Sequence, residues 1–160
     1  MKHLKCFLTT LLLVYSCFIS AQESNKTVAV SSSSNGYSGA VVIPETVKLW
    51  STVYSVDAIA DEAFFSSGIT SISMPNSVTK IGNDAFSSCS GLTDITIPDC
   101  LVSIGDRAFY NCRGITGIVI PENVRSIGIA AFYQCKKLST VTVNSKTPPT
   151  AKSNAFLDVK

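Results

Sequence analysis

Histidine is almost absent from this sequence. Its 160 residues contain one histidine, His3, which lies in an N-terminal segment with the features of a cleaved signal. Histidine is the commonest general base and the commonest metal ligand. A serine or cysteine nucleophile needs such a base beside it. The sequence therefore predicts neither Ser-His or Cys-His catalysis nor a histidine-bound metal.

The sequence also lacks an excess of either positive or negative charge. The chain has 13 Lys and Arg against 11 Asp and Glu, and Lys2 and Lys5 leave with the signal, so 11 cations face 11 anions. The cations are scattered along the sequence, whereas nucleic-acid binding needs a clustered basic patch. Carboxylate pairs suited to acid–base work are missing too, since Asp94 stands alone. We predict a protein that is not an enzyme and uses no cofactor, metal or nucleic acid.

The chain has one long apolar run, and it lies at the N-terminus. A basic stretch precedes 14 mostly apolar residues, 6–19, and Ala21 offers a small residue for cleavage. This order predicts a signal peptide over residues 1–21, too short to span a membrane comfortably. A lipoprotein signal with a lipidated Cys17 is the alternative, although the bulky Tyr15 fits it poorly. We expect no transmembrane segment and a secreted, periplasmic or cell-surface location.

A short signature repeats down the rest of the chain. Ile-Gly, two further residues and Ala-Phe recur at a step of 23 residues, with looser copies at either end. A unit of this length cannot bury its own apolar face, so successive units must stack. The phenylalanines of the signature should form one buried column: Phe64, Phe86, Phe109, Phe132 and Phe156.

Each unit begins with an alternating segment that predicts a strand. Ile95 and Ile97 point inward on either side of Thr96, and Pro98 then ends the strand because proline has no N–H for a ladder. The stretch after Ala-Phe is too short for an independent helix, which leaves short helical or irregular segments on the convex side.

Both ends of the array depart from this pattern. Residues 22–39 are polar and predict a flexible leader. Nine extra residues between Pro44 and Ile59 predict a β-hairpin around Trp50. The last unit is incomplete, since no strand follows Phe156. We expect one domain, residues 40–160, of about five units.

The full units read Cys-x-x-Leu-x-x-Ile-x-Ile-Pro-x-x-Val-x-x-Ile-Gly-x-x-Ala-Phe, as 89–109 and 112–132 do almost residue for residue. This resembles the BspA-like, or Treponema pallidum type, leucine-rich repeats. The resemblance implies a leucine-rich repeat solenoid with parallel strands on its concave side. It also implies a secreted or surface protein, often acting in adhesion.

Three cysteines share one position in successive units. Cys89, Cys112 and Cys135 lie 23 residues apart, so stacking places them in a line and not around a point. A line does not provide the tetrahedron of a zinc site. Structural packing is the interpretation we favour, with a disulfide between two neighbours as the alternative. Cys100 falls in a turn, as a free thiol, an intermolecular link or a chance replacement of a polar residue.

The outward residues of the strands form the first candidate binding surface. They are small and mostly hydroxyl-bearing: Thr70, Ser71, Ser73, Thr93, Asp94, Thr96, Thr116, Val119, Thr140 and Thr142. One interpretation is a docking surface for a protein or glycan. The other is that threonine simply suits strands.

Aromatic residues outside the core column are the second candidate. Tyr110 and Tyr133 share one position next to the buried phenylalanine and either contact a partner or lie partly buried under the turn. Trp50 either stacks on a sugar or covers the end of the solenoid. We predict a module that binds a protein or glycan of unknown identity, or else a structural envelope component or truncated repeat remnant; the oligomeric state is open.

Overall fold

The computed structural model describes residues 4–6, 17–22, 27–31, 36–49 and 51–160. These residues form strands joined by turns, with no helix among them. The strands are β1 (Leu4–Cys6), β2 (Cys17–Gln22), β3 (Thr27–Ser31), β4 (Ser38–Val42), β5 (Thr46–Leu49), β6 (Thr52–Ile59), β7 (Gly68–Ser73), β8 (Lys80–Ile81), β9 (Asp94–Thr96), β10 (Ser103–Ile104), β11 (Gly117–Ile120), β12 (Ser126–Ile127), β13 (Thr140–Val143) and β14 (Thr150–Ala151).

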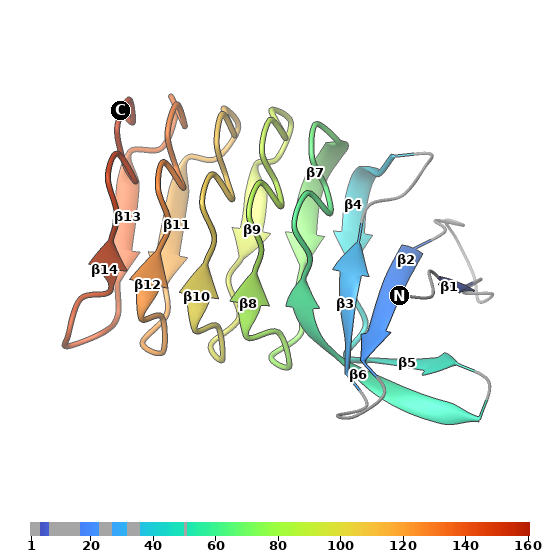
Figure 1. The fold of residues 1–160 in the computed structure, drawn as a ribbon. Helices are drawn as coiled ribbons and strands as arrows, with labels where there is room; N and C mark the ends of the chain where they lie inside the picture. The colour runs from blue at the N-terminus through green and yellow to red at the C-terminus, as the bar shows by residue number, and fades with distance from the viewer. Residues whose placement is uncertain (1–3, 7–16, 23–26, 32–35, 50) are drawn as a thin grey trace.

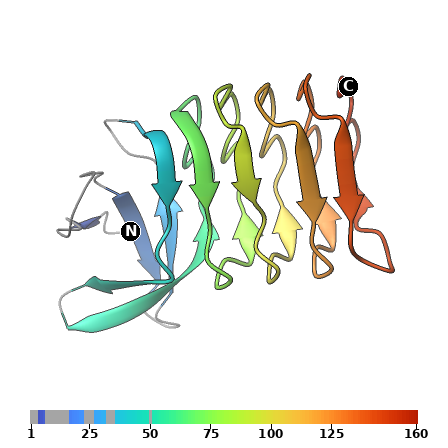
Figure 2. The ribbon, with the colours of Figure 1, turned by 180° about the vertical axis from the view of Figure 1, so that it is seen from behind.

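The strands stack as the coils of a parallel β-solenoid (Figure 1). One sheet runs β3, β6, β8, β10, β12, β14, and every neighbouring pair in that series is parallel. The opposite side, seen from behind in Figure 2, carries β4, β7 and β9 and then β11 and β13. The leucine-rich repeat solenoid predicted from the period and the resemblance is confirmed.

Alternation along the long strands separates a buried row from an exposed row. In β11, Ile118 and Ile120 are buried while Gly117 and Val119 face solvent, as a period of two requires. The strands of the other sheet add a second buried column, in which the isoleucines at the equivalent position of each coil pair in register and are at most 2% exposed: Ile59, Ile81, Ile104 and Ile127.

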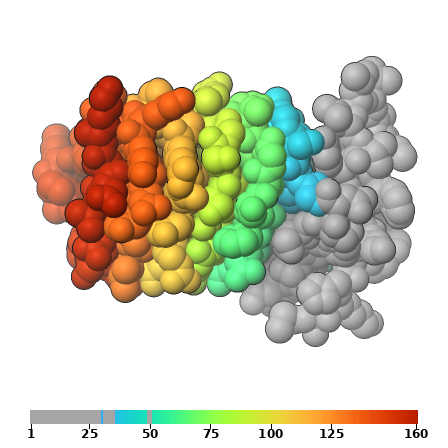
Figure 3. All heavy atoms as spheres, turned by 90° about the horizontal axis from the view of Figure 1, so that it is seen from above, coloured from blue at the N-terminus to red at the C-terminus, as the bar shows by residue number. Residues whose placement is uncertain are grey.

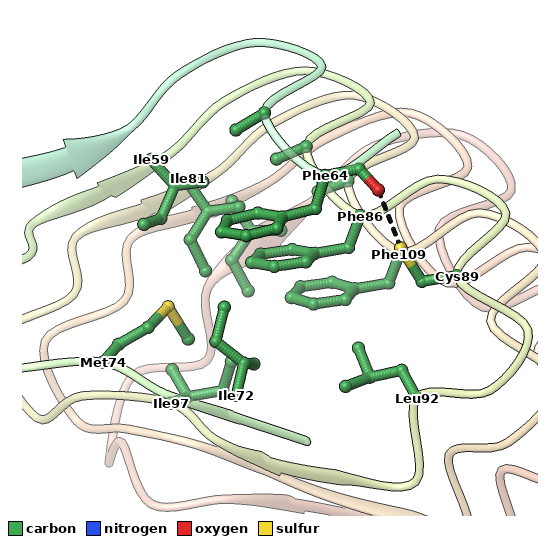
Figure 4. Close-up of a cluster of buried hydrophobic side chains, with 14 of the residues drawn as sticks. Ile59, Phe64, Ile72, Met74, Ile81, Phe86, Cys89, Leu92, Ile97 and Phe109 are labelled. Carbon is green, nitrogen blue, oxygen red and sulfur yellow. Dashed lines mark hydrogen bonds between the residues drawn. The ribbon is translucent and has the colours of Figure 1, made fainter. Parts of the chain in front are cut away.

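The signature phenylalanines stack through the middle of the solenoid. Figure 4 shows Phe64, Phe86 and Phe109 one behind another inside the coils. Successive rings from Phe64 to Phe156 lie 5.1 Å apart between centroids, with planes within 8° of parallel. Each ring therefore fills the space between two coils and fixes their relative register.

The segments after Ile-Gly are irregular turns, which decides between the two predicted alternatives. Two residues per coil, four apart, have a φ between 51° and 63°, in the left-handed region that interrupts a helix. Between them, Phe64 N–H donates to the Ala85 carbonyl of the next coil at 2.7 Å. The paired residues are Glu62 and Ser66, Asp84 and Ser88, Arg107 and Asn111, Ala130 and Gln134, and Asn154 and Asp158. The turns thus hydrogen-bond between coils, as strands do.

The predicted N-terminal hairpin is confirmed. β5 and β6 pair antiparallel, with Leu49 opposite Thr52. Val47 and Tyr54 of this hairpin are buried. Trp50, at its tip, lies outside the described residues, so its predicted roles stay predictions.

Part of the segment predicted to be a flexible leader belongs to the solenoid. β3 pairs in parallel with β6, and β4 with β7. Val30 is 3% exposed, and Tyr37, 5% exposed, packs its ring 4.6 Å from that of Phe64. The repeat pattern misses this coil because seven residues separate Val30 from Tyr37, whereas five separate Ile59 from Phe64.

The predicted signal peptide, its cleavage after Ala21 and the alternative lipidation at Cys17 stay predictions. The structure gives β1 and β2 in this region, and most of the remaining residues fall outside the described ones. No helix with the length and hydrophobicity needed to cross a membrane occurs in the described part of the chain.

Candidate functional site

The structure brings the ten predicted binding residues to the outer side of β7, β9, β11, β13 and the residues just before them, which we name the Ser/Thr face. Nine of the ten are exposed, and Ser71 is half-buried. They lie together because β7 with β9, and β11 with β13, pair in parallel register, which sets equivalent outward positions of successive coils side by side. The arrangement therefore offers one continuous exposed surface.

The register of the strands sets neighbours on this face. Ser73 lies beside Thr96, and Val119 beside Thr142. Val42 of β4 extends the same row past Ser73. Val42 is 76% exposed and Val119 is 51% exposed, so the row carries two apolar contact points among hydroxyl groups.

Hydroxyl groups at the start of the strands are partly engaged with the preceding coil. Thr93 Oγ1 donates to the Thr70 carbonyl at 3.3 Å, and Ser139 Oγ donates to the Thr116 carbonyl at 3.2 Å. A hydroxyl that donates its single proton can still accept from a partner.

The Ser/Thr face shows no constellation suited to catalysis. Asp94 is its single carboxylate among the ten residues. Among the residues that the structure describes, no three His, Cys, Asp or Glu side chains gather in a way that could hold a metal ion. Extended surfaces of repeat solenoids are typically used for binding.

The three cysteines of the repeated position line the core side of the turns. Each is fully buried and free, and each Sγ–H donates to the carbonyl of a phenylalanine in the preceding coil. The sulfur–oxygen distances are 2.9 Å for Cys89 to Phe64, 3.0 Å for Cys112 to Phe86 and 3.1 Å for Cys135 to Phe109. Figure 4 shows the first of these bonds.

Burial raises the pKa of all three thiols, because a thiolate would lose its hydration. For Cys135 the pKa rises to about 11. The thiols are therefore protonated at neutral pH, as their donor role requires, and are poor nucleophiles. Cys100 differs, since it is free and exposed.

The two tyrosines form a stacked pair on the outside of the turns. Their ring centroids are 5.4 Å apart with planes 10° from parallel, and both residues are half-buried. Each ring covers one face of the other. Phe65 and Leu157 occupy the same repeat position in other coils and are about half exposed, at 53% and 49%.

Sequence reasoning missed a set of cations that the fold aligns. Arg113 and Lys136 each follow a cysteine of the repeated position, and Lys160 follows Val159 at the equivalent position of the last coil. Their spacings of 23 and 24 residues are the signal that could have found them. They look scattered in the sequence because they form no run, and only the stacking of the coils aligns them.

A parallel solenoid with a stacked column of phenylalanines inside and an exposed strand face is typical of a leucine-rich repeat protein. The chain belongs to the BspA type leucine rich repeat family, whose sequence profile matches residues 57–160 in six copies. This confirms the resemblance drawn from the repeated residues.

Solved structures agree with this assignment. A leucine rich repeat protein of T. pallidum is 29% identical with a TM-score of 0.78, over 89% of this chain and 64% of that one. A leucine-rich repeat protein from Bacteroides capillosus is 25% identical with a TM-score of 0.71, over 83% of this chain and 97% of that one. The chain thus spans just under two thirds of the treponemal protein's length.

A leucine rich cell surface protein from Faecalibacterium prausnitzii has the same fold, with a TM-score of 0.66 over 95% of this chain and 47% of that one. At 24% identity this likeness concerns the fold alone. No curated protein matches the chain.

Proposed function

We propose that this protein is a secreted or cell-surface adhesion module that binds a protein or glycan through its Ser/Thr face and carries out no catalysis. One observation supports this above the others: nine of ten outward residues on four successive strands are exposed, and the only charge among them is Asp94. The proposed location rests on the signal-like N-terminal segment.

A flat, hydroxyl-rich surface suits a partner with many weak contacts. Its groups donate and accept hydrogen bonds without the desolvation cost of charges. Val42 and Val119 supply apolar area in the same row as Ser73 and Thr96. Affinity on such a surface usually comes from a few central residues, so bulky charges placed there should weaken binding strongly.

The test places two arginines on the Ser/Thr face. The mature chain carrying Thr96→Arg/Thr142→Arg is compared with the wild-type mature chain. Both are tested on arrays of immobilised extracellular-matrix proteins and neutral glycans. We expect at least about tenfold weaker binding of the captured partner, equal to about 1.4 kcal/mol. The measurement is the dissociation constant, with circular dichroism to establish that the fold is unchanged.

The matched control is Val102→Arg/Thr150→Arg, which adds the same charge at two exposed residues on the opposite side, one just before β10 and one in β14. The control should bind as wild type does. Equal weakening by both pairs, or wild-type protein that binds nothing on either array, would contradict an adhesive Ser/Thr face. Protein found only in the cytosol of its source cells would contradict the location.

A further inference from the structure

Charge is segregated along the solenoid axis. Residues 125–160 contain six Lys and Arg and one carboxylate, Asp158, whereas residues 36–124 contain four Lys and Arg and nine carboxylates. A net charge near zero for the whole chain hides this division. The last coils therefore present a positive potential to a charged partner.

Three cations of this C-terminal segment, Lys136, Lys137 and Lys160, together with Arg113 of the coil before it, make up what we name the basic row. All four are exposed. Arg113, Lys136 and Lys160 hold the same position in three successive coils, where the turn leads back toward the long strands, and Lys137 follows Lys136. Seen from above, the coils run side by side as parallel ridges (Figure 3). The stacked phenylalanines give a step of 5.1 Å from one coil to the next.

The basic row is not neutralised by the described residues. Arg107 pairs with Asp84 at 2.7 Å, and Lys152 with Asp106 at 3.6 Å. No carboxylate of the described chain lies within ion-pair distance of any row cation. Asp158, two residues before Lys160, also forms no ion pair with any described residue.

Tyrosine hydroxyl groups accompany the row. Tyr110 and Tyr133 each stand three residues before a row cation. Arg113 Nε–H donates to Asn111 Oδ1 at 2.7 Å, which holds its guanidinium against the turn that carries Tyr110. The terminal guanidinium nitrogens of Arg113 remain available as donors. A tyrosine thus precedes a row cation by three residues in two successive coils.

We propose that the basic row and the tyrosine pair bind a linear anionic polysaccharide, with carboxylate or sulfate groups on successive sugars, lying along the solenoid axis. A single line of donors repeated once per coil fits a polymer that presents its anions along one line. This surface is separate in chemistry from the uncharged Ser/Thr face, and its ligand need not be the adhesive partner proposed above.

Nucleic acid fits this surface less well. Single strands are held by aromatic faces on which bases stack, and the mutual stacking of Tyr110 and Tyr133 removes one face of each ring from that use. A duplex-binding protein typically contacts about six to ten phosphates, more than four cations supply. Binding of a folded acidic protein does not require cations that repeat once per coil.

The test uses the full secreted chain and heparin, a sulfated and carboxylated polysaccharide, as the probe. Arg113→Gln/Lys136→Gln/Lys160→Gln is compared with Lys48→Gln/Lys80→Gln/Lys146→Gln, which removes the same charge from exposed lysines elsewhere. We expect the row variant to bind heparin at least tenfold more weakly, and the control variant to change by less than twofold. Tyr110→Phe/Tyr133→Phe should weaken binding two- to fivefold.

Equal losses in the two glutamine triples would show that net charge alone is responsible, and would overturn the proposal. Duplex DNA or poly-glutamate binding as tightly as heparin at the same salt concentration would overturn the assignment to a polysaccharide, as would absence of heparin binding at about 0.15 M salt. Binding to the matrix-protein and neutral-glycan arrays is measured separately. If the row variant still binds a partner on those arrays but no longer binds heparin, the polysaccharide site and the adhesive Ser/Thr face are distinct.

Discussion

A buried thiol in each of three coils satisfies a specific need of the backbone. The carbonyls of Phe64, Phe86 and Phe109 receive the cysteine Sγ–H, so the cysteine both fills space and supplies a donor. Cysteine combines these properties at a size close to that of a small apolar residue. Reactivity plays no part in such a role.

Thiol modification should therefore separate Cys100 from the cysteines of the core. We expect iodoacetamide at pH 8 to label Cys100 in the native protein, whereas Cys112 reacts only after unfolding, because it is fully buried and its pKa is well above the usual value. Peptide mapping by mass spectrometry with and without urea measures this. Native labelling of Cys112 at the rate of Cys100 would show an open core.

The same burial gives an alkaline dependence of stability. The pKa of Cys135 is raised from 9.0 to about 11, so its thiol contributes stability that is fully present below about pH 9 and lost as the pH rises through 11. Urea midpoints of wild type should fall over this window more than those of Cys135→Val. Identical profiles would mean that the thiol keeps its ordinary pKa.

At the scale of the turn, glycine is required by the approach of one coil to the next. A Cβ at Gly105 would lie 2.6 Å from the carbonyl carbon and oxygen of Gly82. At Gly91 the closest atom, the Ile69 carbonyl oxygen, would be 3.4 Å away. The Ile-Gly turn is therefore a contact of backbone on backbone.

Gly105→Ala should destabilise the protein by about 1–3 kcal/mol, the typical cost of forcing atoms into packed space. Gly91→Ala, the control, should change the free energy of unfolding by no more than about 0.5 kcal/mol. Urea denaturation followed by circular dichroism measures both. Similar midpoints for the two variants would show that neighbouring coils can move apart at little cost.

The turns also show where sequence reasoning reached its limit. The period placed Phe86 and Cys89 in columns, because stacking repeats local geometry from unit to unit. It could not distinguish a helical turn from one with two left-handed residues, since helix propensity over so few residues is weak. Asp84 and Asn111 were a usable signal, because Asp and Asn tolerate positive φ better than most residues.

At the scale of the whole molecule, the sequence predicts the buried columns of equivalent residues well, but it predicts the exposed surfaces only in part. The Ser/Thr face followed from alternation at positions such as Thr96 and Thr142. The coil containing Val30 and Tyr37 was missed, because its loop is two residues longer and a tyrosine takes the place of phenylalanine. The basic row was missed because its members lie far apart in the sequence and meet only when the coils are stacked.

Stability should also vary along the axis. β11 has Ile118 and Ile120 at 3% and 0% exposure, whereas the equivalent Val141 and Val143 of β13 are 39% and 42% exposed. β13 pairs with β11 on one side, and no described strand pairs with its other side. In a repeat protein each coil is stabilised by its interfaces with neighbours, so a coil with one interface opens more readily.

Hydrogen exchange should therefore show a gradient toward the last coil. We expect backbone amides of residues 140–157 to be at least about tenfold less protected than those of residues 104–120, which corresponds to about 1.4 kcal/mol. Hydrogen–deuterium exchange of the full chain, read by mass spectrometry of peptides from both regions, measures the difference.

Phe156→Ala provides a matched variant, because the half-buried ring of Phe156 stacks on Phe132 and on no other phenylalanine of the column. It should lower protection in residues 140–157 and leave residues 104–120 nearly unchanged. Uniform protection in all coils, lowered everywhere by Phe156→Ala, would show that the solenoid opens as a single cooperative unit.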